Sequence, residues 1–153
     1  MVSGDDSVYT RLGNWSDGGN HAFRRRCIAD NSPAAGAGEI TVSDGGLYVF
    51  YDHLAVCRCA VEAGFRQRVL RRPAARDLHG RRQQQLLLED RRSPVATRPP
   101  RRGGEGCAGG PAFASDLLGL VTLEDGDSVW IEARPASAVY RPNDASFFGL
   151  YRL

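Results

Sequence analysis

The sequence has no lysine, no long apolar run and almost no helical periodicity. All twenty of its basic residues are arginine. No run of eighteen apolar residues occurs, so no segment is long enough to cross a membrane as a helix. The polar and acidic start of the chain, Met1 to Asp6, is unlike a signal peptide. Weak helical periodicity together with abundant glycine favours an all-β fold with many turns.

The length and charge of the chain predict one domain with an unusual insert. Its 153 residues, of which 42% are hydrophobic, are enough for a proper core. Residues 62–106 hold twelve arginines and five acidic residues, a net charge of +7, whereas the rest holds eight arginines and thirteen acidic residues, a net charge of −5. We therefore expect a poorly ordered segment over 1–20 and a domain over 21–153. That domain carries a basic insert of low order at 62–106.

Three segments, 46–56, 117–123 and 147–153, are apolar on both faces of a strand. A strand that is apolar on one face can border water, but one that is apolar on both faces needs a cover on each side. Because the sequence gives no good helix signal, a neighbouring subunit is the better candidate for the second cover. The periodicity thus predicts an antiparallel β-sandwich that oligomerises through one sheet.

Side chains alternate between the two faces of a strand, so each segment divides into two sets. Gly149, among aromatics, lets a neighbouring ring or backbone come close. Asp125-Gly126 predicts a hairpin turn at 124–127. Further strands are predicted at 21–28, 39–42 and 129–134, with two candidates at 64–70 and 84–89 inside the insert. Over 46–56 and the following Cys57, one face carries Leu47, Val49, Tyr51, His53, Ala55 and Cys57, and the other carries Tyr48, Phe50, Asp52, Leu54 and Val56.

Catalytic and metal-binding candidates are sparse. The three histidines are His21, His53 and His79, and no spacing places a nucleophile or carboxylate beside His53. Cys57 and Cys59 share a strand face, but structural zinc usually takes four ligands. We therefore expect no enzyme activity, no metal site and no cofactor.

The cysteines and one sequon bear on the compartment. Asn14-Trp15-Ser16 is an acceptor sequence, which makes Asn14 the candidate glycosylation site. Four cysteines form two disulfides in an oxidising compartment, with three possible connectivities, and remain reduced thiols otherwise. The pairing is left open among Cys27, Cys57, Cys59 and Cys107.

The arginine-rich insert has two interpretations. It is either a solvated loop or a site for a polyanion such as heparan sulfate on a cell surface. Nucleic acid is not expected as a partner, because Phe65 is the only aromatic residue in the insert that could stack on a base. The candidate polyanion-binding residues are Arg66, Arg68, Arg71, Arg72, Arg81 and Arg82.

Three motifs, in family order, resemble the tumour necrosis factor (TNF) homology domain. Gly-Leu-Tyr-Val-Phe-Tyr at 46–51 is similar to its Gly-Leu-Tyr-aliphatic-aliphatic-Tyr strand. Gly-Leu-Val-Thr-Leu-Glu-Asp-Gly-Asp at 119–127 is similar to its Gly-aliphatic-x-Leu-Glu-x-Gly-Asp hairpin. Phe-Phe-Gly-Leu-Tyr-Arg-Leu at 147–153 is similar to its C-terminal strand. The matches cover roughly the last two-thirds of the domain, apart from the insert.

The resemblance implies a jelly-roll sandwich that assembles as a homotrimer. It implies an extracellular cytokine, secreted or shed from a type II membrane precursor, that binds TNF-receptor-family ectodomains in the grooves between subunits and signals by clustering them. Receptor-contact residues stay unassigned, because the family's contact loops fall within 62–106, which aligns with nothing in the family. The family disulfide is also left open, since its second cysteine falls near Ser115 and Cys107 lies eight residues earlier. The residues that the resemblance places in the trimer interface are Val49, Tyr51, His53, Phe147, Tyr151 and Leu153.

The head domain of complement C1q is the alternative. It shares the jelly roll and the trimer, and the motif at 46–51 would suit it as well. Against it, C1q-like chains usually carry a smaller residue where Phe148 stands, and no collagen-like Gly-X-Y run precedes the domain. In that case the protein is an extracellular recognition module rather than a cytokine.

Overall fold

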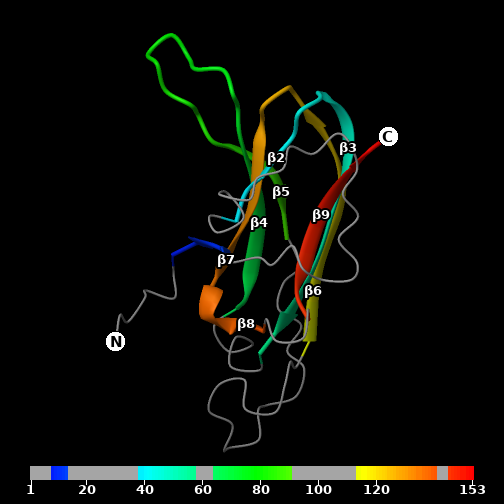
Figure 1. Ribbon diagram of the computed structural model, residues 1–153. Coiled ribbons are helices and arrows are strands. Elements are labelled where there is room, and N and C mark those ends of the chain that lie inside the picture. Colours follow the sequence, from blue (N-terminus) through cyan, green and yellow to red (C-terminus); the bar gives the residue numbers. More distant parts are fainter. Residues whose placement is uncertain (1–7, 14–37, 58–63, 91–112, 141–144) are drawn as a thin grey trace, which may run out of the picture.

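The protein is a sandwich of two antiparallel β-sheets (Figure 1). The computed structural model describes residues 8–13, 38–57, 64–90, 113–140 and 145–153. Within those ranges the only helical element is the single 3-10 turn η1 (Ala136–Ala138). The predicted all-β sandwich is therefore confirmed. Asn14 and the strand predicted at 21–28 lie outside the described residues.

One sheet, called the β7 sheet below, has β7 at its centre. Strands β1 and β2 pair with one edge of β7, and β4 pairs with the other edge and carries β5 beyond it. All of these pairings are antiparallel. The strands are β1 (Thr10–Arg11), β2 (Ile40–Thr41), β4 (Arg66–Arg72), β5 (Gln85–Glu89) and β7 (Ser128–Arg134).

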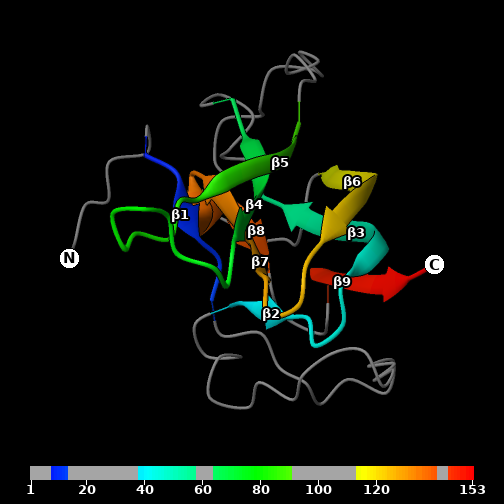
Figure 2. The same ribbon diagram turned by 90° about the horizontal axis from the view of Figure 1, so that it is seen from above.

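The other sheet, called the β3 sheet, is built around the longest of the predicted two-sided strands. Strand β3 (Gly46–Val56) pairs along its whole length with β6 (Phe113–Leu123). On its other edge β3 pairs with β9 (Phe147–Arg152) and then with β8 (Val139–Tyr140). Viewed from above, the β3 sheet forms one layer and the β7 sheet the other (Figure 2). The three two-sided segments are thus neighbours in one sheet.

The core lies between the two sheets and follows the predicted alternation. Tyr48, Phe50 and Leu54 point inward from β3 and are fully buried, and Val69 and Ile131 meet them from the β7 sheet. Each fully buried large apolar side chain contributes about 1.5–3 kcal/mol to stability. Of the two sets of side chains that alternation predicts for β3, the set with Tyr48, Phe50 and Leu54 is therefore the inward one.

Two expectations about order differ from the structure. Residues 8–13 are part of the sandwich, because β1 pairs with β7 and Leu12 is buried in the core. Within the supposedly low-order insert, β4 and β5 are strands of the β7 sheet, as the two strand candidates there indicated. The arginine-rich composition of β4 predicted low order. In the structure, arginines of β4 pair with acidic residues from segments far away in the chain, which composition alone does not show.

Candidate interaction surface

The outward side of the β3 sheet is apolar and exposed. We call it the β3 face and define it by the outward residues of the three long strands. Most side chains there are exposed, with no second layer formed over them by the residues that the structure describes, whereas their neighbours on the same strands face the core. Its members are Leu47, Val49, Tyr51 and His53 of β3, Asp116, Leu118 and Leu120 of β6, and Phe147, Gly149, Tyr151 and Leu153 at the C-terminal end.

The strand register arranges these residues in cross-strand rows. Tyr51 lies between Leu118 on β6 and Gly149 on β9, and Val49 lies between Leu120 and Tyr151. Directly opposed side chains on one sheet face pack against each other. The rows therefore make a continuous apolar surface rather than scattered exposed residues.

Gly149 shapes the middle of this surface. A Cβ at that position would meet the Tyr51 hydroxyl, so the Tyr51 side chain extends across the space that glycine leaves open. The Tyr51 ring also lies 6.2 Å from the Tyr151 ring, in a tilted arrangement. The close approach expected at Gly149 is thus made by a ring of the same chain.

A polar pair borders the β3 face at one end. The His53 ring stacks on Phe147 with centroids 5.3 Å apart. Its Nδ1 is hydrogen-bonded to Oδ1 of Asp116, on the neighbouring strand, at 2.6 Å. Both side chains are partly exposed. The pair orients the imidazole by a contact that the sequence analysis did not foresee, because Asp116 was not assigned to this surface.

The structure brings the six proposed interface residues onto one surface, with one difference. Tyr51, Phe147, Tyr151 and Leu153 are exposed or half-exposed, and His53 is partly exposed, whereas Val49 is only 8% exposed. Sequence reasoning left Leu118 and Leu120 out of the interface. Their alternation with Leu117 and Val121 could have identified them, since it places them on the opposite side from the core.

Beneath the β3 face, the inward face of β3 carries one buried carboxyl group. Asp52 is 5% exposed, and its Oδ1 accepts a hydrogen bond from the Leu117 amide at 3.0 Å. Its Oδ2 and the Oε1 of the neighbouring Gln67 are both buried acceptors without a donor. Burial raises the pKa of Asp52 to about 7. The protonated form of Asp52 is therefore favoured in the folded protein up to about pH 7.

Gln67 extends this polar network between the sheets. Its Nε2 donates to the Ser115 hydroxyl at 2.7 Å, and that hydroxyl donates to Oδ2 of Asp90 at 3.3 Å. Gln67 is fully buried and Ser115 nearly so. The network therefore joins β3, β4 and β6 in an otherwise apolar interior.

The outward side of the β7 sheet, called the β7 face, differs sharply from the β3 face. Its Trp130 is completely buried because arginines lie over its ring: the Arg11 guanidinium is 4.2 Å from the ring centroid and that of Arg72 is 5.6 Å away. Glu39 accepts from both arginines, from Arg11 Nη1 at 2.5 Å and from Arg72 Nη2 at 2.6 Å. An aromatic residue on this face is thus covered by charged groups of the same chain.

Three of the six arginines proposed for polyanion binding pair with acidic side chains of the same chain, and a fourth bonds a backbone carbonyl. Arg68 pairs with Glu132 at 2.7 Å and lies over the Tyr9 ring. Arg71 pairs with Asp127 at 2.8 Å. Together with Arg72, these side chains are neutralised within the molecule. Arg66 donates to the Asp90 carbonyl oxygen.

Arg81 and Arg82 lie apart from that network, in the exposed loop between β4 and β5. The six proposed residues therefore do not form one patch. The structure separates them into a paired set on β4 and an exposed set on the loop.

The described residues form neither a metal-binding cluster nor a helix that could span a membrane. Over those ranges no group of three or more His, Cys, Asp or Glu side chains is placed to hold a metal ion. Cys57 is buried and disulfide-bonded, and its partner lies outside those ranges. In the part of the chain that the structure describes, no helix is long and apolar enough to cross a membrane.

Comparisons of the sequence with known proteins give no match: no protein-family model fits the chain, and no curated protein matches it.

Proposed function

We propose that the protein is an extracellular TNF-like cytokine that assembles as a homotrimer through the β3 face and clusters TNF-receptor-family ectodomains. The observation that carries this proposal is the β3 face itself, a continuous apolar surface on which Leu118 of the edge strand β6 is 77% exposed. Contiguous exposed apolar surface on a small domain usually marks an interface. The resemblance of its three strands to the TNF homology domain supplies the jelly-roll topology, the threefold assembly and the receptor class.

Two further features support the proposal. The disulfide at Cys57 is the bond expected of a protein in an oxidising compartment. The β3 face is rich in aromatic side chains, and Tyr51, Phe147 and Tyr151 are the residue types that predominate in interface cores. The mechanism is multivalency: three equivalent grooves bring three receptors together, and geometry rather than catalysis carries the signal.

The assembly is tested by sedimentation of the purified protein and of two matched variants. Leu118→Asp puts a carboxylate on the β3 face, whereas Leu86→Asp puts one on β5, where the leucine is 54% exposed. Both positions are open in a single chain, so neither change should unfold it. We expect a trimer for wild type and Leu86→Asp, and a folded monomer for Leu118→Asp, because an unpaired charge is costly to bury. A wild-type monomer at micromolar concentration would refute the assembly.

The receptor class is tested separately by capture on a panel of TNF-receptor-family ectodomains. The wild-type trimer should bind at least one member, and Leu118→Asp should lose that binding because the grooves exist only between subunits. A trimer that binds no member of the panel would favour the C1q-like alternative, which shares the assembly but not the receptor.

A further inference from the structure

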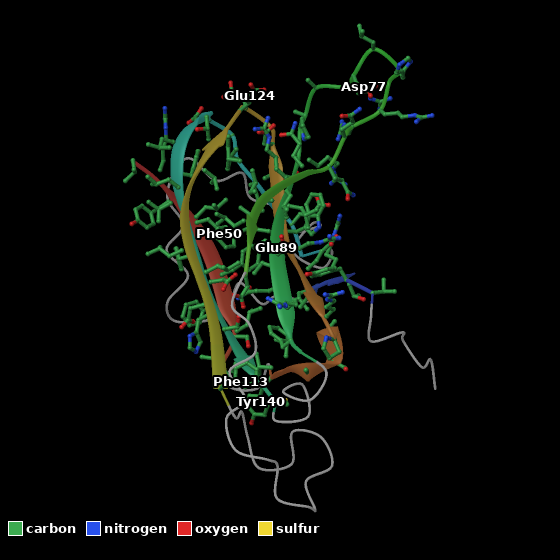
Figure 3. The ribbon with its side chains drawn as sticks, turned by 180° about the vertical axis from the view of Figure 1, so that it is seen from behind. Phe50, Asp77, Glu89, Phe113, Glu124 and Tyr140 are labelled. Atoms are coloured by element: carbon green, nitrogen blue, oxygen red, sulfur yellow. The ribbon has the colours of Figure 1, made fainter. Side chains whose placement is uncertain are left out.

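The loop between β4 and β5, residues 73–84, projects beyond the end of the sandwich that carries Glu124 (Figure 3). At its tip, Leu78 is fully exposed, with a relative accessibility of 102%. Most other exposed leucines lie on a sheet face and have cross-strand neighbours, whereas Leu78 is held away from the body. The assembly proposed above does not use this loop.

The tip is a preformed turn rather than a loose connection. The Asp77 amide donates to the Arg81 carbonyl at 2.8 Å, and the Gly80 amide donates to the Asp77 carbonyl at 2.9 Å. Oδ1 of Asp77 accepts from the amides of His79 and Arg81 at 2.9 and 2.8 Å. Gly80 closes the turn at φ +72°, a conformation that other residues resist. The chain thus fixes Leu78 in an outward position.

Three arginines of the loop flank this leucine in the sequence. Arg76 precedes the turn, and Arg81 and Arg82 follow it, all exposed. Among the described residues, no acidic side chain pairs with any of the three. The only acid of the loop is Asp77, which is engaged by backbone amides and by Gln83 Nε2 at 3.2 Å. The loop arginines are therefore available to an external anion, unlike those of β4.

We propose that the loop 73–84 docks on an anionic phospholipid membrane, with Leu78 inserted at the headgroup boundary and Arg76, Arg81 and Arg82 on lipid phosphates. A basic rim around an inserted apolar side chain is the charge and polarity pattern that such a surface complements. A sulfated polysaccharide would use the arginines but offers no apolar layer for Leu78. Binding by one loop is weak, and several copies on one surface would strengthen it.

The proposal is tested by co-sedimentation of the intact protein with vesicles of phosphatidylcholine, with and without phosphatidylserine. We expect binding only when phosphatidylserine is present, and weaker binding as salt rises. Leu78→Ser should lower the partition coefficient roughly tenfold, and the double change Arg81→Gln and Arg82→Gln should lower it by a similar factor. Leu86→Ser is the matched control, an exposed leucine outside the tip, and should leave binding unchanged.

Leu78→Trp supplies a second readout that does not depend on the strength of binding. Its additional fluorescence should shift to the blue with phosphatidylserine vesicles, because the indole enters an apolar layer, and should not shift with soluble heparin. Two outcomes would overturn the proposal. One is no binding to anionic vesicles. The other is binding that needs the arginines but not Leu78, with heparin bound equally well, which would identify a polyanion site. Sedimentation of the same variants without vesicles measures their assembly, so a loss of membrane binding is distinguished from a loss of the trimer.

Discussion

The β7 face and the β3 face both carry large aromatic side chains on the outside of a sheet, but the two sets of rings differ in what covers them. On the β7 face, Trp130 is covered by Arg11 and Arg72, which Glu39 holds in place. On the β3 face, Tyr51 and Tyr151 pack against each other and against their cross-strand neighbours, and both rings remain partly exposed. The first face is completed within one chain. The second is open among the described residues, and this contrast is the physical basis of the proposed assembly.

The buried acidic groups divide in the same way. Glu39 and Asp127 are buried beside arginines of the β7 sheet, whereas the largest influence on Asp52, in the β3 sheet, is desolvation. A buried carboxylate with a cation is tolerated, and one without a cation gains a proton instead. Substitutions that alter these residues therefore test the comparison directly.

The largest expected effect is that of Asp52→Asn, and it depends on pH. The pKa of Asp52 is raised from 3.8 to about 7 in the folded state, so the folded protein holds more protons than the unfolded chain between about pH 4 and 7. Its ionisation therefore lowers stability progressively as pH rises through that window, by up to about 4 kcal/mol above pH 7. Asparagine removes this penalty and can donate to Gln67. Urea denaturation should show the variant more stable at pH 8 and the two proteins converging below pH 4.

The exposed Asp44→Asn is the matched control and should not reproduce the gain in stability at pH 8, because its side chain is not buried. A pH-independent effect of Asp52→Asn would contradict the prediction. It would indicate that Asp52 is charged in the fold and that the Gln67 amide is turned to donate to it.

An intermediate effect is expected on the β7 face. Glu39→Gln removes the carboxylate between Arg11 and Arg72 and leaves two guanidinium groups close together over Trp130. We expect a loss of about 2 kcal/mol, less than for a fully buried pair because both arginines are partly exposed. Glu89→Gln, on the exposed side of β5, should change stability by less than about 0.5 kcal/mol. If Glu39→Gln and Glu89→Gln change the free energy of unfolding equally in urea denaturation, the charged groups over Trp130 contribute nothing to stability.

The smallest effect is expected at Gly149. Gly149→Ala places a methyl group against the Tyr51 ring, which must move. We expect a loss of about 1 kcal/mol in the stability of the single chain and a weaker trimer by roughly tenfold. Adding Tyr51→Phe, which removes the hydroxyl nearest to the new methyl, should restore part of the loss. No change in assembly on Gly149→Ala would mean that the position of Tyr51 does not matter to a partner.

Much of the β3 sheet could be predicted from the sequence because its strands alternate cleanly. Alternation at 46–56 and 147–153 predicted these strands and their two sets of side chains, and Asp125-Gly126 predicted the turn between β6 and β7. The β7 sheet was harder. Strand β1 is only two residues long, and β4 reads as Arg-Gln-Arg-Val-Leu-Arg-Arg, a composition typical of a solvated segment.

The candidate sites also differ in whether they depend on local alternation or on contacts between distant residues. The two-residue period divided each strand into two sets of side chains, and the resemblance chose the outward set, of which the structure leaves five of the six proposed residues partly open to solvent. The paired arginines of β4 could not be separated from the loop arginines, because their partners Glu132, Asp127 and Glu39 lie about 30 to 60 residues away in the chain. Alternation placed Asp52 on the face of β3 that is buried, but it could not show that Gln67 of β4 lies beside it.

The sequence by itself determined that this protein is an all-β sandwich with a sheet that is apolar on both sides, because side-chain alternation is a local property of each strand. Only the tertiary structure decided which charges are neutralised, that Asp52 is buried without a cation, and that Leu78 is held away from the body among unpaired arginines. The physical reason is that burial and ion pairing depend on contacts between residues far apart in the chain. No local pattern encodes them.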